Sequence, residues 1–171
     1  MNCFTSGAPI AGMALLVAAP AAAQQLSPKE IGSVRPELIR FDRFAAFPTG
    51  AEIAKVVGDP TKPGPYVVRV RVAAGVKLLP HVHPEDRIYT VMSGVFYIGF
   101  GTVFDEEKLQ AFAPGSIVIL PGNTPHFHWA ASGEYITQVS GSGPLGINYV
   151  DAKNDPRSKG HAAAASDNSA P

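Results

Sequence analysis

Residues 75–94 read GVKLLPHVHPEDRIYTVMSG, and this stretch decides the predicted fold. His81 and His83 lie two positions apart in a run rich in strand-forming residues. Successive side chains of a strand point to opposite faces of the sheet, so these two imidazoles share one face. The stretch therefore predicts a strand that presents two histidines close enough to bind one ion.

Residues 115–129, GSIVILPGNTPHFHW, repeat this arrangement with His126 and His128. The fifth histidine, His161, lies in a tail of small and polar residues. Neutral imidazole is the commonest ligand of transition metals in proteins, and several imidazoles together suit Fe, Mn, Ni, Cu or Zn. The alternative is four structural histidines whose ring nitrogens are hydrogen-bonded. We expect a divalent transition metal ion as cofactor, and the candidate ligands are His81, His83, His126 and His128.

The spacing in both stretches resembles the two motifs of the cupin family. The first motif is Gly, five residues, His-x-His, three or four residues, Glu, six residues, Gly, and it matches here at Gly75, His81, His83 and Gly94. The second is Gly, five residues, Pro-x-Gly, two residues, His, three residues, Asn, and it matches at Gly115, Pro121 and His126. The resemblance implies a small, single-domain cupin, which is a double-stranded β-helix or jelly-roll barrel.

Three motif positions differ from the cupin pattern. Arg87 stands where the family has its Glu ligand, and a guanidinium cannot coordinate a metal. Asn123 replaces a glycine, a mild change because Asn tolerates left-handed backbone. Ala130 replaces the closing Asn. His128 could fill the vacant ligand position, and so could Glu85 or Asp86 if the turn before Arg87 shifted. The other possibility is a degenerate cupin that has lost its metal.

Arg87 and Tyr89 are the candidate catalytic residues. If Arg87 points into the barrel, its two-pronged guanidinium would hold a carboxylate or enolate, and Tyr89 could donate a proton. Alternatively, Arg87 pairs with Glu85, Asp86 or another carboxylate and has a structural role. Further side chains are expected to form the pocket walls: Val91, Tyr97 and Gln138.

The remaining pattern is typical of an all-β protein. Residues 66–72, YVVRVRV, alternate between apolar and polar, as expected of a strand with one buried face. Residues 88–100 form two β-rich runs that Ser93-Gly94 would join in a tight hairpin. Phe127 and Trp129 would lie outside the barrel, where an N-terminal arm or a second subunit could cover them. Together with the resemblance, this predicts a homodimer.

The composition predicts one barrel domain with extensions at both ends. Residues 1–23, an apolar run of small residues ending in Ala-Ala-Ala, resemble a signal peptide and indicate a periplasmic or secreted protein. The alternative for this run is an apolar disordered or membrane-anchoring segment. Residues 24–50 would form an N-terminal arm and residues 51–150 the barrel. Residues 151–171 would be a disordered C-terminal tail.

Charge and cysteine content exclude several functions. Fourteen basic and fourteen acidic residues give a net charge of zero, with no basic cluster of the kind that binds nucleic acid or anionic membranes. The single cysteine would be removed with the signal, which excludes disulfides and thiol catalysis. The sequence predicts a metal-dependent enzyme of oxygenase, isomerase or lyase type that acts on a small, possibly anionic, organic molecule. The alternative is a non-catalytic barrel that binds or senses such a molecule.

Overall fold

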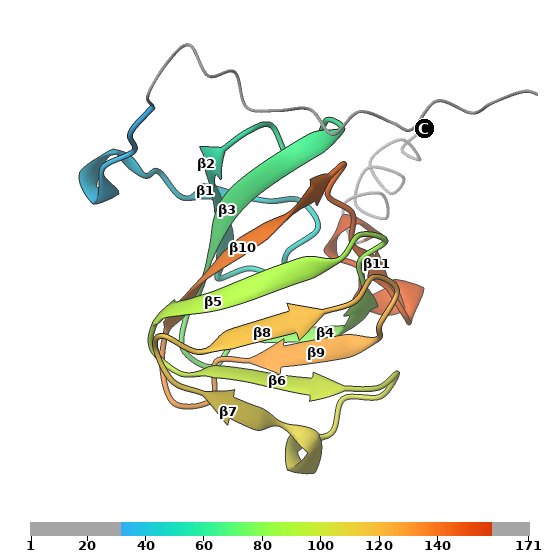
Figure 1. Cartoon of the computed structure of the whole chain (residues 1–171). Helices are drawn as coiled ribbons and strands as arrows, with labels where there is room; N and C mark the ends of the chain where they lie inside the picture. Colours follow the sequence, from blue (N-terminus) through green and yellow to red (C-terminus); the bar gives the residue numbers. More distant parts are fainter. Residues whose placement is uncertain (1–31, 159–171) are drawn as a thin grey trace, which may run out of the picture.

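The computed structural model describes residues 32–158, which are almost entirely β-structure (Figure 1). Within this range, no helix combines the length and the apolar character needed to cross a lipid bilayer. The strands are β1 (Asp42–Arg43), β2 (Ala51–Val57), β3 (Gly64–Val72), β4 (Lys77–Val82), β5 (Arg87–Ser93), β6 (Phe96–Phe100), β7 (Gln110–Phe112), β8 (Ile117–Leu120), β9 (His126–Trp129), β10 (Tyr135–Gly143) and β11 (Asn148–Tyr149). The 3₁₀ helices are η1 (Pro36–Leu38), η2 (Glu106–Lys108) and η3 (Ala152–Asn154).

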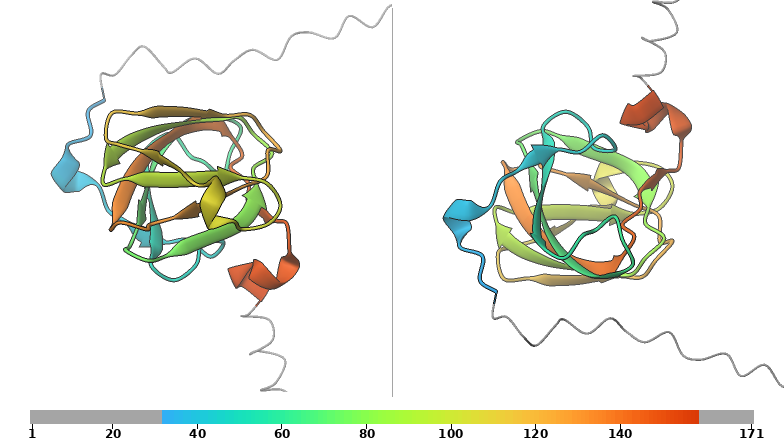
Figure 2. Two further views of the ribbon diagram at one scale, coloured as in Figure 1. Left: turned by 90° about the horizontal axis from the view of Figure 1, so that it is seen from below. Right: turned by 90° about the horizontal axis from the view of Figure 1, so that it is seen from above.

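Two antiparallel sheets face each other and enclose the core (Figures 1 and 2). Their strand orders are β1-β2-β3-β10-β5-β8 and β11-β4-β9-β6-β7. Many neighbouring strands are far apart in the sequence, such as β3 beside β10 and β4 beside β9. The inward-facing residues of both sheets form one buried apolar cluster. This arrangement is the jelly-roll barrel that the two motifs predict, and the all-β fold class is confirmed.

The predicted alternation of β3 is confirmed. Its inward-facing residues, from Tyr66 to Val72 at every second position, are all at most 9% exposed. The arginines between them face outward, where Arg71 pairs with Glu52 of the neighbouring strand. A period of two thus separates an apolar inner face from a solvated outer face, as expected of an antiparallel sheet.

The predicted hairpin at Ser93-Gly94 is wrong. Both runs are strands, but β5 pairs with β10 and β8 in one sheet, whereas β6 pairs with β9 and β7 in the other. The turn therefore carries the chain from one sheet to the other. Tight-turn residues between two β-rich runs do not reveal which strands pair, because both strands bury one face and find partners from distant parts of the chain.

Replacing Gly94 with Ala should destabilise the protein by more than about 2 kcal/mol, because two costs combine. Gly94 has φ +68°, and a Cβ there would lie 2.8 Å from Tyr135 Cα and even closer to the Glu134 carbonyl oxygen. Gly75→Ala is the matched control, since Gly75 has φ +80° but no atom within 4 Å of the added Cβ. Urea unfolding should show a clearly smaller loss for Gly75→Ala, and equal losses would contradict the steric argument.

The outward-facing aromatics of β9 are covered by the chain itself. Phe127 is fully buried, and its ring centroid lies 5.0 Å from that of Phe104, in the connection between β6 and η2. The Lys77 ammonium lies 4.3 Å from the centroid of the Trp129 ring. The expectation that an arm or a second subunit covers these aromatics is therefore wrong for Phe127, whereas for the half-buried Trp129 it stays a prediction, as does a homodimer.

The segment before β2 reaches farther into the barrel than an external arm would. β1 pairs with β2, and Phe47, only 9% exposed, joins the buried apolar cluster next to Phe44. Phe47 is anchored by a backbone hydrogen bond of 2.8 Å from its own N–H to the Phe44 carbonyl. Phe47 is therefore part of the barrel core rather than of an arm on its outside. The predicted signal at residues 1–23 lies outside the described residues.

The first eight residues of the predicted C-terminal tail are ordered. Asp151 caps η3 through its carboxylate, which accepts a hydrogen bond from the Lys153 backbone N–H. Arg157 pairs with Asp155 and donates a hydrogen bond of 3.0 Å to the Ile147 carbonyl. Residues 151–158 therefore have defined structure, held by polar side-chain contacts that composition alone did not indicate. The rest of the predicted tail, 159–171, lies outside the described residues.

Candidate metal centre

Three histidines from two neighbouring strands meet inside the barrel. His81 ends the inward row of β4, His83 follows that strand, and His126 begins β9, where it is the register partner of His81. All three are buried, and each offers a ring nitrogen such that these three atoms lie within 4.8 Å of one another. This is the geometry needed to hold a metal ion.

The second motif is tied to the first by a turn at Asn123. Asn123 has φ +59°, a left-handed conformation that Asn tolerates better than most residues. Its backbone N–H donates a hydrogen bond of 2.6 Å to the His83 carbonyl. The turn therefore places the start of β9, with His126, directly beside the end of β4.

Backbone carbonyls orient the three imidazoles. The Nδ1 atoms of His81 and His126 lie 2.8 Å from the carbonyls of Leu79 and Thr124, and that of His83 lies 2.7 Å from the carbonyl of Gly146. A carbonyl only accepts hydrogen bonds, so each Nδ1 carries the proton and each Nε2 carries a free lone pair. This is the outer-shell arrangement that metal-binding histidines adopt.

The Nε2 atoms of two of these histidines have no hydrogen-bond partner among the described residues. Those of His81 and His126 are fully buried, and so is that of His128. A buried polar atom without a partner costs stability unless something satisfies it. The donor set therefore fits a transition metal ion better than a purely structural role.

His128 lies beside this group without belonging to it. Its ring centroid is 5.0 Å from that of His126 and 5.4 Å from that of His81. The ring packs edge-on against Phe96 and Tyr89, deeper in the barrel. His128 thus faces the same interior as His126 but lies two residues farther along β9.

Arg87 points into the barrel, as the interpretation as a ligand-binding residue requires. It also pairs with Glu85, as the structural interpretation requires. Nε of Arg87 donates a hydrogen bond of 2.9 Å to Glu85 Oε1, and both side chains are at most 10% exposed. Tyr66 donates to the same carboxylate oxygen. Arg87 Nη2 also donates to the Gly146 carbonyl, which accepts from His83 as well. The ion pair and His83 therefore share one anchor.

Neither candidate acid joins the histidine group. The second Glu85 oxygen accepts a hydrogen bond from the Gly146 backbone N–H, so both of its oxygens are engaged. Asp86 is exposed and accepts a hydrogen bond from the backbone N–H of Gly122. Within residues 32–158, the group of possible ligands contains histidines alone.

The interior beside the histidines contains a small cavity of about 20 Å³, which we call the inner cavity. Tyr89 lines it, as predicted, together with Arg87 and His128. The other three predicted pocket walls, Val91, Tyr97 and Gln138, do not line it. Gln138 faces outward, where its side chain accepts a hydrogen bond of 3.3 Å from Arg69.

Several solved structures share this architecture. The polyketide cyclase RemF from Streptomyces resistomycificus matches with a TM-score of 0.64 and 14% identity, over 77% of this chain and 94% of that chain. KdgF from Halomonas sp. matches with a TM-score of 0.50 and 20% identity, over 63% and 91%. The DMSP lyase DddQ from Ruegeria pomeroyi DSS-3 matches with a TM-score of 0.51 and 15% identity, over 63% and 57%.

These three solved structures share a cupin-type barrel. The chain has a cupin fold. No family model and no curated protein matches the sequence. At these low identities the likeness establishes the cupin barrel and leaves the activity to be argued from the site.

Burial keeps the histidines of this cupin barrel neutral. Desolvation lowers the pKa of all four, to about 4 for His126, and the nearby Arg87 charge lowers them further. Neutral imidazole is the metal-binding form. The site is therefore ready to bind a cation at neutral pH without first losing protons.

The metal-free cupin should lose stability as the pH falls from 6.5 toward 4. The unfolded chain protonates its histidines near pH 6.5, whereas the folded chain resists protonation, so acid favours unfolding. For His126 alone, lowering the pKa from 6.5 to about 4 corresponds to about 3 kcal/mol. Urea unfolding of chelator-treated protein at several pH values measures this loss. A His126→Asn variant should lose less over the same range, and an equal loss would contradict this assignment.

The sequence analysis misses three residues around the site. It places Tyr66 only on a buried strand face and Phe47 only in an N-terminal arm, and it gives Gly146 no role. Phe47 also lines the inner cavity. The inward parity of Tyr66 was visible in the alternation of its strand, but no pattern in the sequence indicated that Gly146 and Phe47 approach the histidines.

Proposed function

We propose that this cupin is a metal-dependent enzyme that acts on a small anionic organic molecule. The observation that carries the proposal is the set of His81, His83 and His126, whose ligand atoms lie within 4.8 Å of one another with their Nδ1 atoms bound to backbone carbonyls. Carbonyl-oriented imidazoles of this kind prepare a site for an ion such as Fe, Mn, Ni, Cu or Zn. Such an ion would supply Lewis-acid polarisation or, if redox-active, electron transfer.

The charge balance of the interior favours an anionic ligand. The histidines are neutral, and the carboxylate of Glu85 is already neutralised by Arg87. Within residues 32–158, the group of possible ligands therefore has no carboxylate to offset the two positive charges of a divalent ion. An anionic substrate could provide the missing negative charge, which is why we infer an organic acid or an enolate rather than a neutral molecule.

Tyr89 is suited to donate a proton in the inner cavity. Burial raises its pKa, although the positive charge of Arg87 opposes this shift. The phenol therefore keeps its proton at neutral pH and can deliver it to a reacting group. Because Glu85 holds Arg87 firmly, Arg87 would orient Tyr89 and a bound anion rather than move during the reaction.

A non-catalytic binding barrel is the second candidate. The inner cavity of about 20 Å³ favours it, because a cavity of that size holds about one water molecule. A protein that only senses a metal, or a ligand bound near it, needs no larger space. The two candidates differ in turnover, not in the residues that bind the ion.

Reconstitution with each metal, followed by incubation with small carboxylic acids with and without O₂, tests the enzyme proposal. Mass spectrometry should detect metal-dependent product, and Tyr89→Phe should lower the rate by about 100-fold, the scale of one general acid. Metal content should stay unchanged in Tyr89→Phe, since Tyr89 is not a ligand. Metal binding without turnover of any acid would favour the binding barrel.

Export to the periplasm or the medium and homodimer formation also remain our proposals. The apolar run at residues 1–23 supports export. The exposed Ile88, Ile117 and Ile119, on the outer face of β5 and β8, offer an apolar surface that a second copy could cover.

A further inference from the structure

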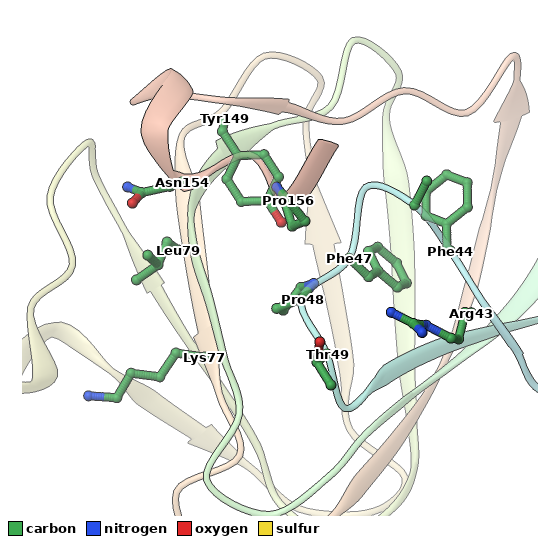
Figure 3. A pocket seen from close by; sticks show the side chains of 11 residues that line it. Arg43, Phe44, Phe47, Pro48, Thr49, Lys77, Leu79, Tyr149, Asn154 and Pro156 are labelled. Carbon is green, nitrogen blue, oxygen red and sulfur yellow. The ribbon is translucent and has the colours of Figure 1, made fainter. Parts of the chain in front are cut away.

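A much larger cavity lies outside the inner cavity, on the other side of Phe47. This outer cavity has a volume of about 400 Å³ and is formed by residues 43–49, β4, β11 and the turn after it (Figure 3). Figure 3 shows Phe44, Phe47 and Arg43 on one side and Leu79 and Lys77 on the opposite side. Tyr149 lies above them in this view. Its hydroxyl donates a hydrogen bond of 2.9 Å to the Ala46 carbonyl, and this bond ties β11 to residues 43–49.

Phe47 separates the two cavities. Its side chain lines both of them. Strand β4 also lies between the cavities, because Leu78 lines the inner cavity and the next residue, Leu79, lines the outer one. Phe47 belongs to the turns of residues 44–50 rather than to a strand. Its ring therefore lies between the inner cavity, which the histidines line, and a space large enough for a small molecule.

The sizes of the two cavities indicate which part of a substrate each cavity could hold. The inner cavity has room for about one water molecule, so only the end of a substrate could reach the histidines. The outer cavity has the volume of a typical small-molecule site. The body of any substrate larger than a few atoms would have to lie in the outer cavity.

Arg43 provides a charge for which the structure offers no protein partner. Within residues 32–158 its side chain makes no ion pair or hydrogen bond, and its neighbour across the strand pair, Glu52, is bound to Arg71. The other cation in the cavity wall, Lys77, pairs with Glu106 at 2.9 Å. Arg43 therefore remains available for a carboxylate, for which its planar guanidinium is suited.

We propose that the outer cavity binds a carboxylate and the apolar body of a substrate whose opposite end, the reacting acid or enolate group, reaches the histidines past Phe47. Arg43 pairs with the carboxylate, and the rings of Phe44, Phe47 and Tyr149 pack against a planar apolar body. The link to the histidines rests on the proposed function, whereas the carboxylate site itself does not depend on a metal.

Calorimetric titration of the full chain with 1-naphthoate, with and without Zn²⁺, tests the carboxylate site. Naphthoate should bind saturably, and Arg43→Gln should weaken it about tenfold, the loss expected for one charge-assisted contact. Neutral 1-naphthamide should bind more weakly and be insensitive to Arg43→Gln. Arg40→Gln is the control: Arg40 bonds to the Glu37 carbonyl and does not line the cavity, so its replacement should change nothing.

Proton relaxation of bound naphthoate tests the link to the histidines. In the Mn²⁺-loaded chain the naphthoate protons should relax faster than in the Zn²⁺-loaded chain, because the paramagnetic ion acts at short range. Faster relaxation that disappears in Arg43→Gln at equal naphthoate concentration would support the proposal. Equal relaxation in both forms would overturn the shared path past Phe47.

Three further outcomes separate the two proposals. Metal uptake without naphthoate binding overturns the outer site and leaves the metal centre standing. Arg43-dependent naphthoate binding without metal uptake supports the outer site and sinks the proposed enzyme. Binding that appears only after residues 159–171 are deleted would show that the chain's own tail occupies the cavity, which overturns a substrate site.

Discussion

Replacing His81 and His126 together with alanine is expected to lower the affinity for transition metal ions by far more than about 100-fold, the upper range for outer-shell substitutions alone. The double variant removes two of the three grouped ligand atoms, and these two have the buried, unpartnered Nε2 atoms. His83 and His128 would remain, but two imidazoles rarely hold an ion against competition from water.

Elemental analysis of the full chain after dialysis measures this effect. The parent should contain a near-stoichiometric transition metal, and the double variant almost none. His161→Ala is the control, since it keeps the four barrel histidines. His128→Ala tests whether His128 is a fourth ligand, because the metal content should then fall in this variant as well. A parent without metal, even after reconstitution, would contradict the metal centre.

Glu85→Gln is expected to cost about 3–5 kcal/mol of stability, because it leaves a buried guanidinium without its counter-charge. Arg87 is 5% exposed at its side chain and Glu85 10%, so water cannot replace the lost carboxylate. The substitution also weakens the hydrogen bonds from Tyr66 and the Gly146 backbone. Urea unfolding of the metal-free protein measures the loss.

Glu52→Gln is the matched control for this prediction. Glu52 and Arg71 form the same type of pair on the outer face of the barrel, but both side chains are about one-third exposed. Surface pairs contribute about 1 kcal/mol or less, so Glu52→Gln should have a small effect. A Glu85→Gln, Arg87→Met double variant should recover much of the stability, since it removes the buried charge as well. Equal losses for both single Glu variants would contradict the role assigned to burial.

The Glu85 pair also connects stability to the metal centre. Arg87 and His83 both donate to the Gly146 carbonyl, so loosening Arg87 frees this anchor. We therefore expect Glu85→Gln to weaken metal binding through His83 in addition to its effect on unfolding. The counter-charge of Arg87 thus comes from Glu85, two residues earlier in the chain.

Local patterns were sufficient to predict individual strands and the histidine rows. The period of two places His81 and His83 on one face, and the alternation of β3 identifies its buried side, because both follow from the geometry of a single strand. The partners of each strand did not follow in the same way. The Ser93-Gly94 turn resembled a hairpin, yet β5 and β6 pair with strands far away in the sequence.

The sequence by itself determined the barrel class and the candidate metal ligands, since motif spacing and side-chain parity are local properties of the chain. Only the tertiary structure decided that Arg87 is paired with Glu85, that Gly146 anchors His83, and that Phe47 separates two cavities. The His83–Gly146 contact joins residues 63 positions apart, and the Tyr149–Ala46 contact beside the outer cavity joins residues 103 positions apart. Their formation depends on how the sheets close and which charges become buried, and no local spacing contains that information.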